Sequence, residues 1–432
     1  MRRSTKLFAV VAILATVAAG CAKKSTGGTS AAASCTSNKL KGFAVGAATH
    51  SATYTAAGVM AQSSSKPEYD IGMFGDLTGS ASALVIPIRN AAQLAVDQAN
   101  ASGKASDGTP LQATIKLVVQ DNPNHLATTA PPIEQAFIDN KKVVGVIGGA
   151  FSGETNAVGK KFANAGLTHI TASATDPTIT SHGWPFFRLV VSDAVQGKKM
   201  ADVIAATGCK NVAVIDDKEP YGQGLADAVK AELTAKGVTI ADRESIDAKV
   251  TDFSTLIDTF AAKKPDAVFY GGYYNTAGLL LKQMRERGQN SLFTCGDGCA
   301  DKQLITTATA ADSTNVFVTC PCTIPVFAAA GSKAAQLQQD YKAKFKIDAL
   351  IYSSEAYDAA NIFIAAIAHG GANVTRASVL AFVKALNGFP GVSHNYKFQA
   401  NGELDTASQS IAVYPVKNGA LELLGTTEQA IG

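Results

Sequence analysis

Short apolar runs alternate with longer amphipathic stretches along the chain from Tyr69 onward. The run YDIGMFG predicts a buried strand, and the stretch after it places Ile88, Ala92 and Ala99 on one face of a helix. The alternation continues, and further strands are expected in ATIKLVVQD, VVGVIGG, LTHITAS, NVAVIDD, GVTIADRESI, DAVFYGG and SLFTCG. Strands separated by helices of this length predict an α/β fold with parallel sheets and right-handed crossovers. Because a second series starts near Ser192, we expect two such lobes.

The C-terminal part returns to helices, which we expect at 331–346, 352–368 and 376–387. It finishes with the β-like segments NYKFQ, SIAVYPVK and ALELLG, of which the last two are expected to form a hairpin at Asn418-Gly419.

The N-terminus predicts export. A basic start, MRRSTK, precedes the run LFAVVAILATVAA, which is too short to span a bilayer comfortably. The run ends at AAGC, a spacing that resembles a lipoprotein signal, in which cleavage leaves Cys21 to carry lipid. We therefore expect a signal peptide over 1–20, and a lipidated Cys with a flexible linker over 21–67. The alternative is an ordinary cleaved signal with an incidental cysteine, which would leave the protein exported but without a lipid anchor.

Six further cysteines form an even set, which in an exported chain favours disulfides over metal binding. They are Cys35, Cys209, Cys295, Cys299, Cys320 and Cys322. SLFTC and STNVFVTC predict neighbouring parallel strands, so we expect at least one disulfide between the 295/299 pair and the 320/322 pair. Whether Cys35 meets Cys209 is open, and zinc binding by the other four cysteines is the alternative.

Composition and motifs argue against nucleic-acid binding and catalysis. The net charge of +3 is small and unclustered. The sequence contains no G-x-S-x-G elbow, no H-E-x-x-H and no P-loop, and its six histidines lack ligand-like spacing. We therefore expect a protein that is not an enzyme and that needs no metal or cofactor.

In open α/β sheets, ligands bind beyond the carboxyl ends of the strands. Ser152 follows VVGVIGG at an expected helix start, where a hydroxyl and free backbone N–H groups suit a carboxylate. Ser173, Ala174 and Thr175 follow LTHI, and such small residues let a ligand approach the backbone closely. The alternatives are a plain N-cap for Ser152 and a turn before proline for the other three.

The second series places aromatic and acidic residues at its strand ends. Tyr221 and Tyr273 can line a pocket or pack at its rim. Asp297 lies in CGDG between two cysteines, where it is a metal ligand, a redox neighbour, a turn residue or the wall of a pocket. Because cysteines of an exported chain are structural, the pocket wall is favoured.

Several segments, taken in order and spacing, carry a family resemblance. They are IGMFGDLTGSAS with RNAAQLAVDQANASG, VVGVIGGAFSGET, HITASATDPTIT, FFRLVVSDAVQG, DDKEPYGQGLAD, DFSTLIDTF, FYGGYYNTAG and CGDG. From about Tyr69 to its end, the chain resembles the extracellular solute-binding proteins of branched-chain amino acid ABC transporters, of the Leu/Ile/Val-binding type.

The resemblance implies a type 1 periplasmic-binding-protein fold, with two Rossmann-like lobes joined by three crossovers and closing like a Venus flytrap. Lobe I is then expected over 68–190 and 323–405, and lobe II over 191–322 and 406–426.

The resemblance also implies roles for single residues. Ser152 matches the serine that takes the ligand carboxylate, and 173–175 match the segment that holds carboxylate and ammonium. Tyr273 and Asp297 match the ammonium site of the second lobe. Two further aromatics, Tyr221 and Tyr352, match residues near the ligand side chain. Leu84 departs from the aromatic residue common in Leu/Ile/Val binders.

The implied function is capture of an amino acid, aliphatic or branched-chain, and its delivery to an ABC permease by a monomer anchored outside the cytoplasmic membrane. One alternative is the same fold binding a short amide, urea or an aromatic acid, against which Asp297 argues. The other is a ligand sensor for a separate receptor.

Overall fold

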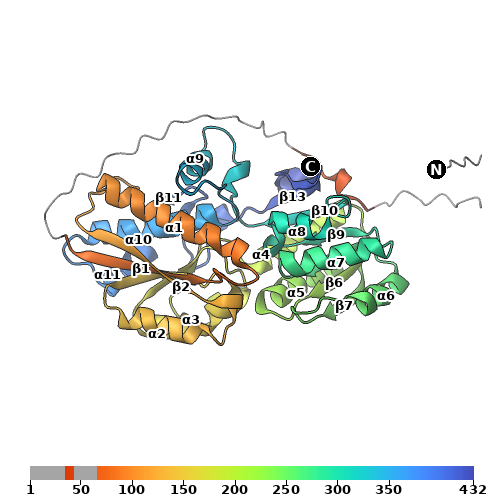
Figure 1. Ribbon diagram of the computed structural model, residues 1–432, viewed down its shortest axis with the longest axis horizontal. Helices are drawn as coiled ribbons and strands as arrows, with labels where there is room; N and C mark the ends of the chain where they lie inside the picture. Colours follow the sequence, from red (N-terminus) through yellow and green to blue (C-terminus); the bar gives the residue numbers. More distant parts are fainter. Residues whose placement is uncertain (1–34, 43–65) are drawn as a thin grey trace, which may run out of the picture. The chain divides into compact units, whose positions relative to one another are not determined.

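The computed structural model describes residues 35–42 and 66–432 (Figure 1). The predicted signal peptide, the lipidation site Cys21 and most of the predicted linker lie outside the described residues. Within those residues, no helix combines the length and apolarity needed to cross a membrane.

The first sheet forms lobe I and has the strand order β2-β1-β3-β4-β5, with every neighbouring pair parallel. Its strands are β1 (Glu68–Gly75), β2 (Thr114–Asp121), β3 (Val143–Ile147), β4 (Thr168–Thr171) and β5 (Phe187–Arg188). Strands β3 and β4 are buried along their whole length, as expected of apolar runs with helices on both faces of the sheet. The two-residue strand β5 was not expected from the sequence.

The second sheet forms lobe II and has the order β14-β13-β10-β9-β8-β6-β7, with β15 also paired to β13. Its parallel strands are β6 (Asn211–Asp216), β7 (Thr239–Ser245), β8 (Ala267–Gly271), β9 (Leu292–Cys295) and β10 (Val316–Cys320). Its antiparallel strands are β13 (Ala412–Lys417), β14 (Ala420–Leu421) and β15 (Gly425–Thr426). The predicted hairpin is confirmed, because Lys417 pairs with Ala420 across Asn418-Gly419.

Helices pack on both sheets. Those of lobe I are α1 (Ser82–Ser102), α2 (Ala130–Asp139), α3 (Ser152–Asn164), α9 (Lys333–Phe345), α10 (Ser353–Gly370) and α11 (Arg376–Lys384). Those of lobe II are α4 (Asp193–Ala206), α5 (Pro220–Ala235), α6 (Ser254–Lys263), α7 (Tyr274–Glu286), α8 (Lys302–Ala308) and α12 (Thr427–Ile431). A separate small sheet pairs β11 (Asn387–Pro390) with β12 (Asn395–Lys397).

The chain passes between the lobes three times within residues 66–432. It leaves lobe I after β5, returns after β10 to form α9, α10 and α11, and enters lobe II again before β13. This is the expected topology of two parallel-stranded lobes with three crossovers. The predicted lobe boundaries remain a proposal, and α12 packs on α4 although it follows the predicted end of lobe II at residue 426.

The cysteine pairing differs from the prediction. Strands β9 and β10 are parallel neighbours as expected, with Val318 opposite Cys295. However, the structure joins Cys295 to Cys299 and Cys320 to Cys322, so the expected disulfide between the two pairs is wrong. The reason is local: a single 3-10 turn after β9 brings Cys299 back to Cys295. A disulfide sulfur offers no thiolate, so this pairing also removes the zinc alternative.

Candidate functional site

A small cavity lies where strands of both sheets end. Its lining residues are Leu84, Ile88, Ala150, Phe151, Ser152, Ser173, Ala174, Thr175, Tyr221, Tyr273, Asp297, Gly298 and Tyr352. All eight residues expected to bind ligand are among them, so the structure brings together every position that the sequence singled out for this role.

Lobe I contributes the start of α3 to the cavity. The buried strand β3 ends at Ile147, and the chain reaches Ser152 at the first position of the helix. Ser152 is buried, and its hydroxyl accepts a hydrogen bond of 3.2 Å from the backbone N–H of Asp176. The helix N-terminus therefore points its backbone N–H groups and the Ser152 hydroxyl toward the same space, an arrangement that suits an anion.

The loop after β4 forms the adjoining wall. The Ser173 hydroxyl donates to the Ala150 carbonyl oxygen at 2.7 Å, which ties this loop to the one after β3. Arg188 stabilises the loop, because its guanidinium donates to the carbonyl oxygens of Ala174 and Asp176. The Thr175 hydroxyl is buried and hydrogen-bonds to the carboxyl group of Asp193.

Lobe II contributes Asp297, which lines the same cavity as these residues of lobe I. Its two carboxylate oxygens accept hydrogen bonds from two tyrosine hydroxyls: Tyr221 donates to Oδ1 at 3.1 Å, and Tyr352 donates to Oδ2. Tyr221 begins α5 in lobe II, whereas Tyr352 precedes α10 in lobe I with a left-handed backbone (φ 60°). Asp297 is thus contacted from both lobes at once.

Close packing explains the glycines beside Asp297. A Cβ atom on Gly298 would lie 2.5 Å from the carbonyl oxygen of Gly272, and one on Gly296 would lie 2.6 Å from the Tyr221 hydroxyl. The backbone N–H of Gly298 also donates to that hydroxyl at 3.0 Å. Larger residues at either position would push the turn, and Asp297 with it, out of place.

Burial sets the ionisation of this end of the cavity. It raises the pKa of Asp297, while hydrogen bonds from Tyr352, Gln196 and Tyr221 oppose the rise. Burial also raises the pKa of the Tyr221 and Tyr352 hydroxyls well above the usual value, and the negative charge of Asp297 adds to the effect. The tyrosines therefore stay protonated as donors, and a cation beside Asp297 would favour its charged form.

The remaining wall is apolar. Leu84 and Ile88 come from α1, and the rings of Phe151 and Tyr273 meet edge to face with centroids 5.2 Å apart. Behind Phe151, the ring of His125 stacks at 4.2 Å. Leu84 lies in this wall, where the family resemblance had suggested an aromatic residue.

Asp193 is a buried acid near the site that the sequence analysis did not single out. It is the first residue of α4, it is fully buried, and its carboxyl group accepts a hydrogen bond from the Thr175 hydroxyl. Burial raises its pKa well above the usual value, and the nearby charge of Asp297 adds to this. The segment FFRLVVSDAVQG contained it, but no strand was expected there, so no strand end drew attention to it.

His125 is a second residue that the sequence analysis set aside. Its Nδ1 lies 3.5 Å from Asp76 in lobe I, and its Nε2 lies 3.2 Å from Glu219 at the start of α5 in lobe II. Although burial alone would lower its pKa, hydrogen bonds to Asp76 and Glu219 raise it to about 9. His125 therefore links the two lobes beside the cavity.

Known proteins share this architecture. The sequence matches the periplasmic binding protein family over residues 68–420. It is 29% identical over 361 residues to the Leu/Ile/Val-binding protein BraC3 of Rhizobium johnstonii, covering 81% of this chain and 92% of that protein. It is 28% identical over 354 residues to the leucine-, isoleucine-, valine-, threonine- and alanine-binding protein of Pseudomonas aeruginosa, covering 81% and 90%.

Solved structures agree. The branched-chain amino acid transporter substrate-binding protein LivJ of Streptococcus pneumoniae, in complex with isoleucine, superposes with a TM-score of 0.73 at 25% identity, over 83% of this chain and 99% of that one. The leucine-binding protein LivK of Thermotoga maritima gives a TM-score of 0.74 at 25% identity, over 83% and 98%. With two parallel-stranded lobes around one cavity and a family match over most of its length, the chain belongs to the periplasmic binding protein family.

Proposed function

We propose that this protein captures a free α-amino acid with an aliphatic side chain between its two lobes and delivers it to an ABC permease. The observation that carries the proposal is the placement of Asp297 of lobe II opposite Ser152 and Thr175 of lobe I in one buried cavity. Membership of a family of binding proteins supports solute binding rather than catalysis.

The two ends of a zwitterion need different partners. A carboxylate needs donors, and lobe I offers the hydroxyls of Ser152 and Thr175 and the N-terminus of α3. An ammonium group needs acceptors and a counter-charge, which Asp297 supplies from lobe II. Since each lobe serves a different end, only the closed protein satisfies the whole ligand, and binding then drives closure.

The apolar wall supports an aliphatic side chain. Leu84, Ile88 and Phe151 offer hydrocarbon surface and no charge to the side chain of a bound ligand. The names of the two curated relatives, with BraC3 described as a Leu/Ile/Val-binding protein, support the same class.

We further propose that the mature protein is a monomeric lipoprotein, carrying lipid on Cys21 and held outside the cytoplasmic membrane. The leader MRRSTKLFAVVAILATVAAGC supports this, and the family itself is periplasmic. The lobe limits of 68–190 with 323–405, and 191–322 with 406–426, belong to the same proposal.

A thermal-shift panel of the twenty amino acids, urea, short amides and benzoate tests the proposal. A ligand that binds only the native state at a hundredfold excess over Kd adds about 2.7 kcal/mol of stability and raises the melting temperature. We expect leucine, isoleucine or valine to give the largest rise. A rise with urea, an amide or benzoate and with none of the amino acids would refute the assignment.

A further inference from the structure

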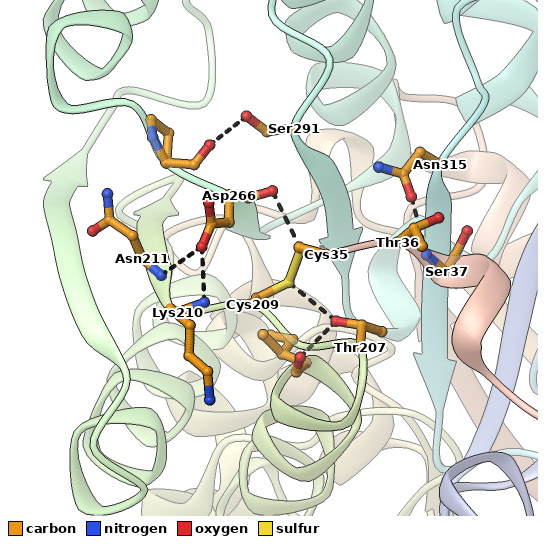
Figure 2. Close-up of a disulfide and its surroundings, with 12 residues drawn as sticks. Cys35, Thr36, Ser37, Thr207, Cys209, Lys210, Asn211, Asp266, Ser291 and Asn315 are labelled. Atoms are coloured by element: carbon orange, nitrogen blue, oxygen red, sulfur yellow. Dashed lines mark hydrogen bonds between the residues drawn. A yellow bond between two sulfur atoms is a disulfide. The ribbon is translucent and has the colours of Figure 1, made fainter. Parts of the chain in front are cut away.

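Residues 35–42 form a short segment, here called the N-terminal strap, that is fastened to lobe II (Figure 2). A disulfide joins Cys35 to Cys209, a pairing that the sequence left open. Both cysteines are buried, with Cys35 only 2% exposed. The Cys35 sulfur also lies 3.3 Å from the carbonyl oxygen of Asp266. The strap is therefore part of the lobe II core at its first residue.

Further contacts hold the rest of the strap. The backbone N–H of Ser37 donates to the side-chain oxygen of Asn315 at 3.0 Å, as Figure 2 shows. The backbone N–H of Lys41 donates to the carbonyl oxygen of Ala430 in α12 at 2.9 Å. A 3-10 turn capped by Thr36 shapes the segment between these contacts. Covalent and hydrogen-bond contacts thus fix the strap along its length.

The strap lies at the pole of lobe II that faces away from the cavity. Asp266 immediately precedes β8, Asn315 immediately precedes β10, and Cys209 lies two residues before β6. All three therefore mark the amino ends of parallel strands. The cavity residues Tyr273 and Asp297 follow the carboxyl ends of β8 and β9. Because parallel strands run in one direction, the strap and the cavity occupy opposite edges of the same sheet.

This position changes the length of any membrane tether that begins at Cys21. Fourteen peptide steps (35 − 21) separate Cys21 from Cys35, and a fully extended chain of that length spans at most about 50 Å. The next described residue after the strap is Lys66 of lobe I, 45 steps (66 − 21) from Cys21, a chain length of at most about 160 Å. Attachment at Cys35 therefore limits the possible span between Cys21 and the folded lobes to about a third of that value and places the attachment on lobe II.

We propose that the N-terminal strap makes lobe II the membrane-tethered lobe, held by its strand-amino pole, while lobe I opens and closes against it. The proposal rests on the proposed lipidation of Cys21. It assigns the Cys35–Cys209 disulfide a mechanical role: the disulfide is the covalent link between the N-terminal strap and lobe II, and it transmits the pull of the lipid anchor to that lobe.

The test cuts the chain between the strap and lobe I. A recognition sequence for a site-specific protease is inserted within residues 43–65 of the full-length lipidated protein, which is reconstituted into phospholipid vesicles. After complete cleavage without reductant, we expect the folded body to sediment with the vesicles, because the strap still joins it to the anchor. The same treatment of C35S/C209S should release the body into the supernatant.

The matched control is C320S/C322S, which also lacks one buried disulfide of lobe II but keeps the strap, and it should sediment like the parent. Release of the cleaved parent, or retention of cleaved C35S/C209S, would overturn the proposal. If the uncleaved protein fails to sediment, the lipidation proposal has failed instead. A non-reducing gel of the cleaved parent then tests the strap alone, since the two fragments must migrate together. Amino acid binding is scored separately by thermal shift.

Discussion

Residues of both lobes contact Asp297, and its buried carboxylate suits a bound cation. Its oxygens accept hydroxyl hydrogen bonds from Tyr221 in lobe II and Tyr352 in lobe I. Each carboxylate oxygen has a second lone pair, so an ammonium group can join without displacing either tyrosine. Asp297 is therefore a contact between the lobes, and we propose that it also binds the ammonium group of the amino acid.

Replacing Asp297 with Asn should weaken amino acid binding by about 2–5 kcal/mol, because a buried ammonium would lose its counter-charge. The fold should survive, since the amide oxygen can still accept one tyrosine hydroxyl. Isothermal titration calorimetry with leucine measures the loss. The matched control is Asp301→Asn, four residues further on, where the side chain only caps α8 by accepting from the N–H of Gln303. Equal affinity of the Asp297→Asn variant and the parent would show that the acid does not bind ligand.

Some residues of the site could be predicted from the sequence, and others could not. Ser152 and Thr175 follow long apolar strands, so the rule that ligands bind at strand ends finds them. Asp193 follows a strand of two residues, too short to leave a pattern. His125 lacks neighbouring histidines or cysteines in the sequence. Its partners, Asp76 and Glu219, lie 49 and 94 residues away, so only the tertiary fold reveals them.

At the scale of elements, the turn η2 (Pro123–His125) and the start of α5 form an ionic contact across the lobes. Both ring nitrogens of His125 face carboxylate oxygens, and a neutral imidazole has only one N–H to donate. Only the imidazolium satisfies both partners. Glu154, buried nearby, adds a further negative field that favours the charged ring. The closed arrangement therefore depends on the protonation of His125.

His125→Gln should destabilise the protein by an amount that depends on pH. Because the folded pKa of about 9 lies above the unfolded value near 6.5, the ionic contribution is full below about pH 6.5 and is lost as the pH rises through about 9. The difference in unfolding free energy between parent and variant should shrink by up to about 3 kcal/mol over that window. Chemical denaturation across this pH range measures it.

The control for this series is His182→Gln, at an exposed histidine that stacks on Trp184. The difference in unfolding free energy between the parent and His182→Gln should not show the same dependence on pH. A constant difference between parent and His125→Gln across the whole range would show that the ring contributes packing and no charge.

Elements were predictable where their apolar pattern was long. The parallel strands β1, β3, β8 and β10 and the hairpin at Asn418-Gly419 were expected from apolar runs and turn residues. Strand β12 lies within NYKFQ, which was expected to be β-like, but its partner β11 was not expected, because a four-residue strand with mostly exposed side chains carries no alternation. Disulfide partners were likewise hidden, since Cys295 pairs within its own turn and not across to the neighbouring strand.

At the scale of the whole molecule, the candidate binding cavity and the N-terminal strap lie at opposite ends of the lobe II strands. The cavity lies beyond the carboxyl ends of the strands, and the strap lies at their amino ends. Closure is a motion of the two lobes relative to each other. A tether attached through the strap, as we propose, would join lobe II at the strand ends that are remote from the cavity.

Lipidation of Cys21 is the premise of this arrangement, and it predicts how the protein partitions. Expressed with its leader, the protein should sediment with membranes, and mass spectrometry should find Cys21 as the mature N-terminal residue with two or three acyl chains. One acyl chain gives only marginal membrane binding, so stable association requires at least two. Cys21→Ser should therefore move the protein from the membrane to the soluble fraction, or leave it unprocessed, while leucine binding is unchanged. Cys35→Ser is the matched control: it also removes an N-terminal cysteine, but the lipid remains, so it should stay with the membranes. A mature chain that starts at another residue and carries no lipid would contradict the anchor, and the strap would then secure only a free N-terminus.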